Sequence, residues 1–357
     1  MKSFRIGSLI VLFLICFSAA GAAVAAAPGA REAFRIGPIV AEPGRAASGF
    51  LQVPAKGDAG TVIPVTVIHG AQAGPVLACV AALHGYEYPP ILALYRLKDK
   101  IDPKGLSGTL IFVHIANVPS FAARSIYYTP GDHKNLNRVF PGDPNGSIAQ
   151  RIAYVLNEEV ITRSDALLDL HGGDGNEALM PYTYWMVGVD QALNEKSKDL
   201  ALAFGLRHII IDNTRGQVLA ESKYLANTAI LRGKPAITTE TGALGSSDEE
   251  YVRMAENGIT QVMRQLKMVP GPVEPVRDPV WIDKYEVLNS GATGLFTPLV
   301  KMGESVAAGQ KLGFVSDYLG RRAQDILAPF EGIILYIIGT PPTSEGEPLV
   351  EVGHLKK

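Results

Sequence analysis

The sequence predicts an α/β fold, in which helices cover the faces of a sheet, followed by a small all-β unit. Short apolar, β-branched runs alternate with longer helical patterns between residues 60 and 265. A proline-rich segment, residues 267–280, ends this alternation. Beyond it, glycines recur at short intervals between apolar pairs, which is typical of short strands joined by tight turns.

The alternating region contains six strand candidates and four helix candidates. The strands are expected at residues 61–70, 75–83, 109–117, 166–172, 208–212 and 235–241, where short apolar runs end in turn residues. The helices are expected at 89–101, 147–161, 191–205 and 248–266, the second of them starting at Ser147, a natural N-cap. In α/β sheets of this kind, ligands bind beyond the carboxyl ends of the strands.

Length and composition indicate one large globular domain with a smaller one after it. The 357 residues are 47% hydrophobic and 19% charged, and Lys+Arg 33 nearly balance Asp+Glu 35. Nucleic acid is not an expected partner, because the chain contains no Lys/Arg-rich run. The expected divisions are a signal peptide (1–27), a large α/β domain (28–267), a linker (268–280) and a C-terminal β domain (281–357).

The first residues have the order of a secretory signal peptide. A positively charged start precedes the apolar core "IGSLIVLFLICF" and the small residues "AAGAAVAAAP", with a possible cleavage site at Ala23-Val24-Ala25. An uncleaved membrane anchor is the alternative, since residues 6–27 are long enough to span a bilayer. We therefore expect an exported protein, periplasmic or secreted. Cleavage leaves only Cys79, which we expect to be a small buried hydrophobe without a disulfide.

The strongest polar signals stand at the ends of predicted strands. His84 and Glu87 follow the second strand, His171 ends "LLDLHGG", and Glu240 ends "AITTETG". Two His and one Glu form a common zinc set in hydrolases, which keep a fourth position for water. Ordinary hydrogen-bonded polar residues are the alternative. Glu240 suits a general base beside such a water, although a turn carboxylate before Gly242 would have the same sequence.

Three neighbouring patterns bear on this site. Asn137 and Arg138 lie in the polar loop "DHKNLNRVFPGDPNGS", where a guanidinium could bind a substrate carboxylate or simply face solvent. Asp169 precedes His171 by one strand repeat and so faces the same side, where it could support that histidine. The aromatic run "MPYTYW" (180–185) could line a pocket or belong to the core.

The ordered motifs "HGYE", "NLNRVFPG", "DLHGG" and "TTETG" resemble the succinylglutamate desuccinylase/aspartoacylase family of the zinc carboxypeptidase clan. The resemblance covers about residues 60–265, and the β unit that follows also looks like the family's C-terminal domain. It implies a carboxypeptidase-like three-layer sandwich, with a mixed sheet, helices on both faces and a small barrel-like C-terminal domain. It further implies one zinc ion per chain on His84, Glu87 and His171, with Glu240 as general acid/base and Asn137 and Arg138 as carboxylate anchors.

The sequence departs from the family pattern at two places. Asn135 stands where the clan often has an Asp that orients the first metal-binding His, and an amide raises His basicity less. Many relatives also carry an upstream Arg that stabilises the carbonyl oxygen in the transition state. Ile126 or Tyr127 stands near that place here, and Arg124 is the nearest candidate.

The resemblance favours a zinc-dependent deacylase that cleaves the amide of a small carboxylate-bearing substrate, such as an N-acyl amino acid. Because catabolic deacylases usually work in the cytoplasm, an exported zinc carboxypeptidase acting on peptides or cell-wall peptides is the alternative. A non-catalytic exported binding protein is the second alternative. The C-terminal unit resembles a lipoyl/biotinyl-type barrel, but its hairpin at Glu331-Gly332 has no Lys. We therefore expect it to shape the active-site mouth or a homo-oligomer contact.

Overall fold

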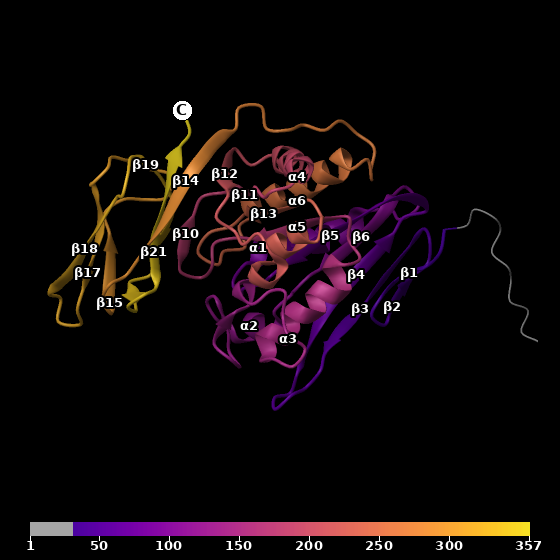
Figure 1. Cartoon of the computed structure of the whole chain (residues 1–357), viewed down its shortest axis with the longest axis horizontal. Helices are drawn as coiled ribbons and strands as arrows, with labels where there is room; N and C mark the ends of the chain where they lie inside the picture. The colour runs from indigo at the N-terminus through magenta and orange to yellow at the C-terminus, as the bar shows by residue number, and fades with distance from the viewer. Residues whose placement is uncertain (1–30) are drawn as a thin grey trace, which may run out of the picture. The chain divides into compact units, whose positions relative to one another are not determined.

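A mixed sheet of thirteen strands is the centre of the fold in the computed structural model, which describes residues 31–357 (Figure 1). The strands lie in the order β10-β19-β21-β14-β12-β11-β13-β9-β5-β6-β4-β3, with β16 beside β19. The expected signal peptide, residues 1–27, falls outside the described residues. Within residues 31–357, no helix is long and apolar enough to cross a membrane.

All six expected strands of the alternating region are confirmed. Neighbouring β5, β6, β9 and β13 run parallel, and buried parallel strands of this kind are apolar throughout. Cys79 is fully buried in β5, as expected, and burial raises the pKa of its thiol. The bounds are β4 (Thr61–His69), β5 (Gln72–Ala81), β6 (Ser107–Val113), β9 (Ala166–His171), β12 (His208–Asp212) and β13 (Ala236–Glu240).

Helices cover both faces of this sheet, which confirms the three-layer arrangement. One face packs against α1 (Tyr88–Lys100), α4 (Gln191–Phe204) and α6 (Glu249–Gln265). The other packs against α3 (Ile148–Val155), the π-helical turn η2 (Leu156–Ile161) that continues it, and α5 (Leu225–Leu231). The four expected helices are therefore present, and α5 and the short α2 (Val118–Ala123) are additional.

Local signals at the helix ends explain where these helices start and stop. Ser147 begins α3 with a capping box, in which its backbone N–H donates to the side chain of Gln150 at 3.1 Å. Asp190 begins α4 by accepting a hydrogen bond from the backbone of Leu193 at 3.1 Å. Gly205 ends that helix at a positive φ of 88°, a conformation that glycine adopts without strain.

Several short strands have no counterpart among the sequence predictions. One of them lies inside the main sheet, two form its edges, and four make up two separate two-stranded sheets. These elements are β1 (Phe34–Ile36), β2 (Ile39–Ala41), β3 (Arg45–Val53), β7 (Tyr128–Thr129), β8 (Lys134–Asn135), β10 (Glu177–Leu179) and β11 (Tyr182–Met186), with the 3₁₀ turns η1 (Leu136–Arg138) and η3 (Leu219–Glu221).

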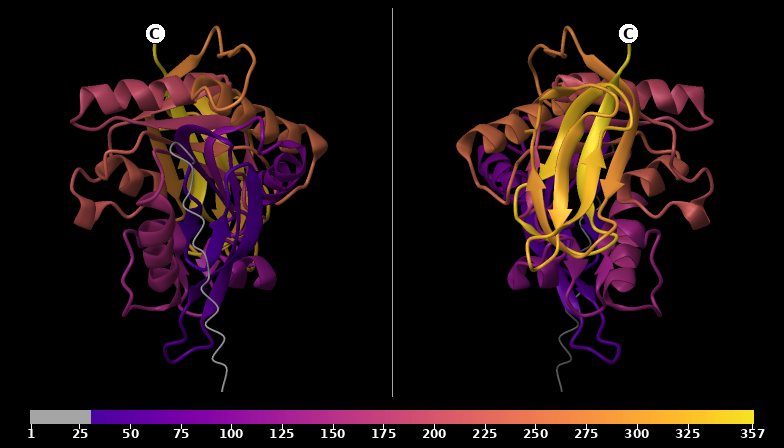
Figure 2. Two further views of the ribbon diagram at one scale, coloured as in Figure 1. Left: turned by 90° about the vertical axis from the view of Figure 1, so that its right-hand side faces the viewer. Right: turned by 90° about the vertical axis from the view of Figure 1, so that its left-hand side faces the viewer.

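The C-terminal part is all-β, as expected, and continues the main sheet through β14, which pairs parallel with β12 and antiparallel with β21. A second sheet, in the order β18-β17-β15-β20, packs beside these strands, and the C-terminal strands run from orange to yellow in Figure 2. Residues 31–357 form one compact unit, so the boundaries at 267 and 280 stay a prediction. The strands are β14 (Val280–Asn289), β15 (Gly294–Pro298), β16 (Ser305–Val306), β17 (Lys311–Ser316), β18 (Arg322–Leu327), β19 (Gly332–Ile338), β20 (Pro342–Thr343) and β21 (Pro348–Leu355).

Candidate metal centre and substrate cavity

The carboxyl ends of three adjacent strands bring the predicted metal and base residues together. His171 is the last residue of β9, and Glu240, the last residue of β13, is its partner in the parallel register. Strand β5 lies on the other side of β9 and is aligned with it up to Ala81, so the turn after β5 carries His84 and Glu87 to the same edge. The placement that the strand ends predict is confirmed.

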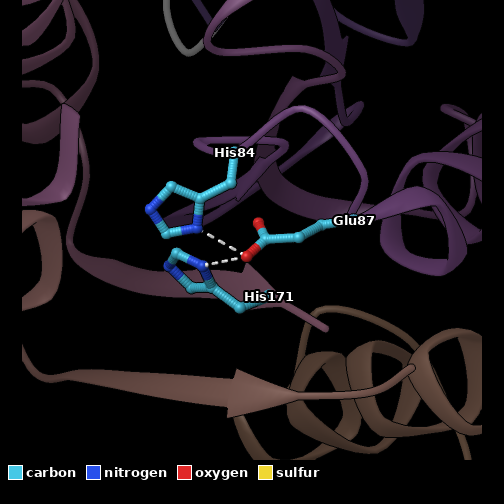
Figure 3. A group of neighbouring side chains, drawn as sticks. All are labelled: His84, Glu87 and His171. Atoms are coloured by element: carbon cyan, nitrogen blue, oxygen red, sulfur yellow. Dashed lines mark hydrogen bonds and ion pairs between the residues drawn. The ribbon is translucent and has the colours of Figure 1, made fainter. Parts of the chain in front are cut away.

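His84, Glu87 and His171 form a compact donor cluster. The Nδ1 atoms of both histidines lie near one oxygen, Oε1 of Glu87, at 2.7 Å for His84 and 3.0 Å for His171 (Figure 3). One ligand atom from each residue lies within 4.8 Å of the others. The second oxygen of Glu87 is buried and has no hydrogen-bond partner among the described residues. Two imidazole nitrogens and a carboxylate therefore converge on one point, which fits the preferences of zinc.

The outer nitrogens of both histidines are held by the protein. Nε2 of His84 lies 3.1 Å from Oδ1 of Asn135, and Nε2 of His171 lies 2.8 Å from Oδ1 of Asp169. Each Nε2–H can donate to its oxygen, which leaves the lone pair of Nδ1 directed into the cluster. Asn135 thus occupies the orienting position that the sequence suggests, and Asp169 supports His171.

The charges of the cluster are strongly linked. Burial alone would lower the pKa of His84, but the carboxylate of Glu87 outweighs it and the net pKa is raised. Burial likewise opposes a charge on His171, yet Asp169 and Glu87 raise its pKa well above the ordinary value. Burial opposes ionisation of Glu87 too, and the two histidines reverse this and lower its pKa. The carboxylates therefore favour protonation of both histidines.

Glu240 faces the same cavity as the cluster. Burial raises its pKa well above the ordinary value, and the carboxylates of Glu87 and Glu177 add to this although His171 opposes it. A carboxyl group with a raised pKa holds a proton more readily than an exposed one, which suits a general acid/base.

A cavity of about 470 Å³ opens beside the cluster. This volume is in the range of small-molecule sites. Its lining is rich in tyrosine and contains acidic and basic groups, with Arg138 and Arg215 as the arginines among the described lining residues. Besides the cluster and Glu240, the polar lining residues are Tyr127, Tyr128, Asn135, Asn137, Arg138, Glu177, Tyr182, Tyr184, Arg215, Tyr224, Thr238, Asn289, Tyr336 and Glu351.

Comparison with known proteins decides the family. The family model described as the succinylglutamate desuccinylase/aspartoacylase catalytic domain matches residues 73–266. The chain belongs to this family. It is 31% identical over 278 residues to the N-alpha-acetyl-L-2,4-diaminobutyric acid deacetylase of Halomonas elongata, covering 75% of this chain and 79% of that protein.

Solved structures agree with this assignment. The product-bound ectoine utilization protein EutE (DoeB) from Ruegeria pomeroyi matches with a TM-score of 0.76 and 27% identity, over 87% of this chain and 95% of that one. A succinylglutamate desuccinylase/aspartoacylase from Rhodobacter sphaeroides has the same fold, with a TM-score of 0.76 and 23% identity over 87% of this chain and 96% of that one. The resemblance on which the fold prediction rests is thereby confirmed.

Asn137 and Arg138, neighbours in the loop motif, have different surroundings. Asn137 is buried, with Nδ2 3.2 Å from Nε2 of His171 and with Oδ1 accepting a hydrogen bond from the backbone of Leu225 at 2.8 Å. Its amide oxygen is therefore occupied at the start of α5, while its amide nitrogen lies against the His171 ring nitrogen that faces Asp169. Arg138 lines the cavity and lies over the ring of Tyr224 at 4.7 Å, while Nη1 donates to the carbonyl oxygen of Asn137 at 2.8 Å. Their roles as carboxylate anchors stay predictions.

Arg124 is not brought to the cavity. It ends α2 in the left-handed conformation, with a φ of 52°, and is exposed. The residues of this segment that reach the cavity are Tyr127 and Tyr128, and the ring centroid of Tyr127 lies 6.3 Å from that of His84. The segment, residues 121–132, therefore places phenol groups in the cavity and leaves the arginine in solvent.

The sequence interpretation missed Arg215 and the contribution of the C-terminal strands. Arg215 follows the carboxyl end of β12, forms an ion pair with Asp212 and lies 3.8 Å from the ring centroid of Tyr224. The strand-end rule that located His84 would have found it in "IIIDNTR". Tyr336 and Glu351 come from β19 and β21, and no motif marks them. The C-terminal unit therefore lines the cavity, which agrees with the first of its two expected roles, shaping the mouth of the site or forming a homo-oligomer contact.

Proposed function

We propose that the protein is a zinc-dependent hydrolase that removes the acyl group from a small N-acyl amino acid. The observation that carries this proposal is the convergence of both Nδ1 atoms and Glu87, with Glu240 in register beside them, on one cavity that also holds arginines. The name of the Halomonas relative, a deacetylase of an acetylated diamino acid, supports the same reaction class.

The proposed roles follow from the positions of the residues. His84, Glu87 and His171 would hold one zinc ion, which would supply Lewis acidity toward water and toward the substrate carbonyl. The carboxylate of Glu240 accepts a proton from the attacking water and returns it to the nitrogen of the leaving amine. Free guanidinium nitrogens of Arg138 and Arg215 bind the substrate carboxylate and position the amide.

Two other functions fit part of this geometry. An exported carboxypeptidase would use the same donor cluster and the same arginines on the C-terminal carboxylate of a peptide. A binding protein would keep the cavity without turnover. The signal-like residues 1–27 support export to the periplasm or the outside, which we include in the proposal.

Metal analysis with matched histidine variants tests the zinc site. The native protein should contain about one zinc per chain, and His84→Ala should lose it. His354→Ala is the control, because His354 pairs with Asp283 and is not among the lining residues. Absence of zinc binding after reconstitution would overturn the metal site and with it the hydrolase.

A substrate panel separates the remaining functions. N-acyl amino acids and short peptides should be compared with the native protein and Glu240→Gln, which should keep zinc and lower kcat by about 10²- to 10⁴-fold. Faster cleavage of peptides would favour the carboxypeptidase. Ligand binding without any turnover in the zinc-loaded protein would favour the binding protein.

A further inference from the structure

Glu351 is a buried carboxylate in the wall of the cavity. It has no role in the proposed reaction steps. It lies in β21, it is only 1% exposed, and it lines the cavity. Its two oxygens each accept one hydrogen bond, from the hydroxyl groups of Tyr182 at 3.1 Å and of Tyr184 at 3.2 Å. Both tyrosines also line the cavity, because alternate residues of β11 face it.

No positively charged side chain of residues 31–357 forms an ion pair with Glu351. Arg215, which lowers its pKa from a distance, pairs directly with Asp212 instead. A buried charge without an opposite charge is costly, and burial accordingly raises the pKa of Glu351 to about 7. A carboxylate has about four acceptor positions, so the two phenols leave roughly half of them free for a ligand.

The surroundings of Glu351 define what that ligand can be. Tyr184 donates to Glu351, and the guanidinium carbon of Arg215 lies 5.5 Å from the ring centroid of the same tyrosine. The guanidinium group and the carboxylate are thus both within reach of one small molecule. The rings of Tyr182 and Tyr184, 5.3 Å apart, provide electron-rich surfaces next to the carboxylate.

We propose that Glu351, held by Tyr182 and Tyr184, binds an ammonium group in the side chain of the substrate. The preferred substrates are therefore N-acyl amino acids with a basic side chain, whose carboxylate goes to the arginines and whose ammonium goes to Glu351. Acidic side chains are disfavoured, because they would place a second carboxylate against Glu351. This assignment rests on the proposed deacylase function and adds its charge specificity.

Isosteric substrates test the assignment. Nα-acetyl-2,4-diaminobutyrate and Nα-acetylnorvaline differ only in an ammonium group replacing a methyl group, and Nα-acetylglutamate presents a carboxylate there. The native enzyme should prefer the cationic substrate to both others in kcat/KM by at least about tenfold. Glu351→Gln should remove this preference, mainly by raising KM for the cationic substrate, with little change for Nα-acetylnorvaline. Glu286→Gln, an exposed position on the neighbouring β14, should keep the native preference.

Two results would overturn the assignment: a native enzyme without preference for the cationic substrate, or a Glu351→Gln variant that retains it. If no N-acyl amino acid is hydrolysed, the proposed function fails separately, and binding decides the inference. Calorimetry with the zinc-loaded protein should then show tighter binding of 2,4-diaminobutyrate than of norvaline. Loss of that difference in Glu351→Gln supports the inference, and equal binding of both amino acids by the native protein overturns it.

Discussion

Replacement of Glu351 by Gln should stabilise the folded protein at alkaline pH. In the native chain the carboxyl group is buried against Tyr182 and Tyr184 without an ion pair among the described residues. The folded state therefore favours the neutral acid, whereas the unfolded chain ionises it freely. Glutamine has nearly the same shape and carries no charge at any pH, so the variant avoids the cost of ionisation.

The size of this effect follows from the pKa. Burial raises the pKa of Glu351 from an ordinary 4.5 to about 7. Because the folded pKa is raised, the favourable contribution is complete below the unfolded pKa and is lost as the pH rises through about 7. Above both values the loss approaches about 3 kcal/mol, at about 1.4 kcal/mol for each pKa unit. Between pH 5 and 8, the native chain should lose about 2.5 kcal/mol relative to the variant.

Urea unfolding of the metal-free native protein and of Glu351→Gln at pH 5 and pH 8 measures this difference. Other titrating groups are present in both chains and cancel in the comparison. Glu286→Gln, in which an exposed carboxylate is replaced, should show almost no pH-dependent change. If Glu351→Gln has the same effect on the free energy of unfolding at both pH values, the native carboxylate ionises without cost and the reasoning is refuted.

Three further predictions concern the metal centre and the cavity. Zinc binding at pH 7 should release between about one and two protons, because His84 and His171 have raised pKa values and must deprotonate to bind the metal. Calorimetry in two buffers of different ionisation heat measures the number of protons released. Zinc binding without proton release would contradict this prediction. Asn135→Asp should tighten zinc binding about tenfold in competition with a chelator, by holding His84 Nε2–H more strongly, and unchanged affinity would disprove that role. Arg124→Ala should leave kcat/KM within about twofold, since Arg124 is exposed. Arg215→Ala should lower kcat/KM at least about 30-fold, and equal effects of the two variants would contradict the placement of the carboxylate site.

The donor cluster was predictable because its placement depends on a rule of parallel sheets. Strands that are buried on both faces are apolar to their last residue, so polar side chains directly after them stand out in the sequence. Since the carboxyl ends of neighbouring parallel strands meet at one edge, residues such as His84, His171 and Glu240 must approach one another there. The helix start at Ser147 was predictable for a local reason, its capping box.

The remaining features depend on contacts that no local pattern encodes. Strand β3, Arg45–Val53, is mostly exposed along its length and carries little apolar periodicity, so only its pairing with β4 defines it. Glu351 stands in a strand whose neighbours are also buried, and the sequence does not indicate which face of that strand meets the cavity. That face is set by the pairing of β14 with β12, which joins residues more than seventy positions apart.

Two different parts of the fold line the cavity, one carrying the proposed reacting groups and the other carrying Glu351. The donor cluster and Glu240 stand on the ends of β5, β9 and β13, whose register fixes the reacting groups. Glu351 and Tyr336 reach the same space from β21 and β19, so the C-terminal strands can alter the charge of the cavity without moving a residue of the donor cluster. Glu351 is costly to bury and forms no ion pair in the described part of the chain, and a substrate cation would offset that cost. The proposed binding of a substrate ammonium group therefore accounts for a carboxylate, and not an apolar residue, at this position.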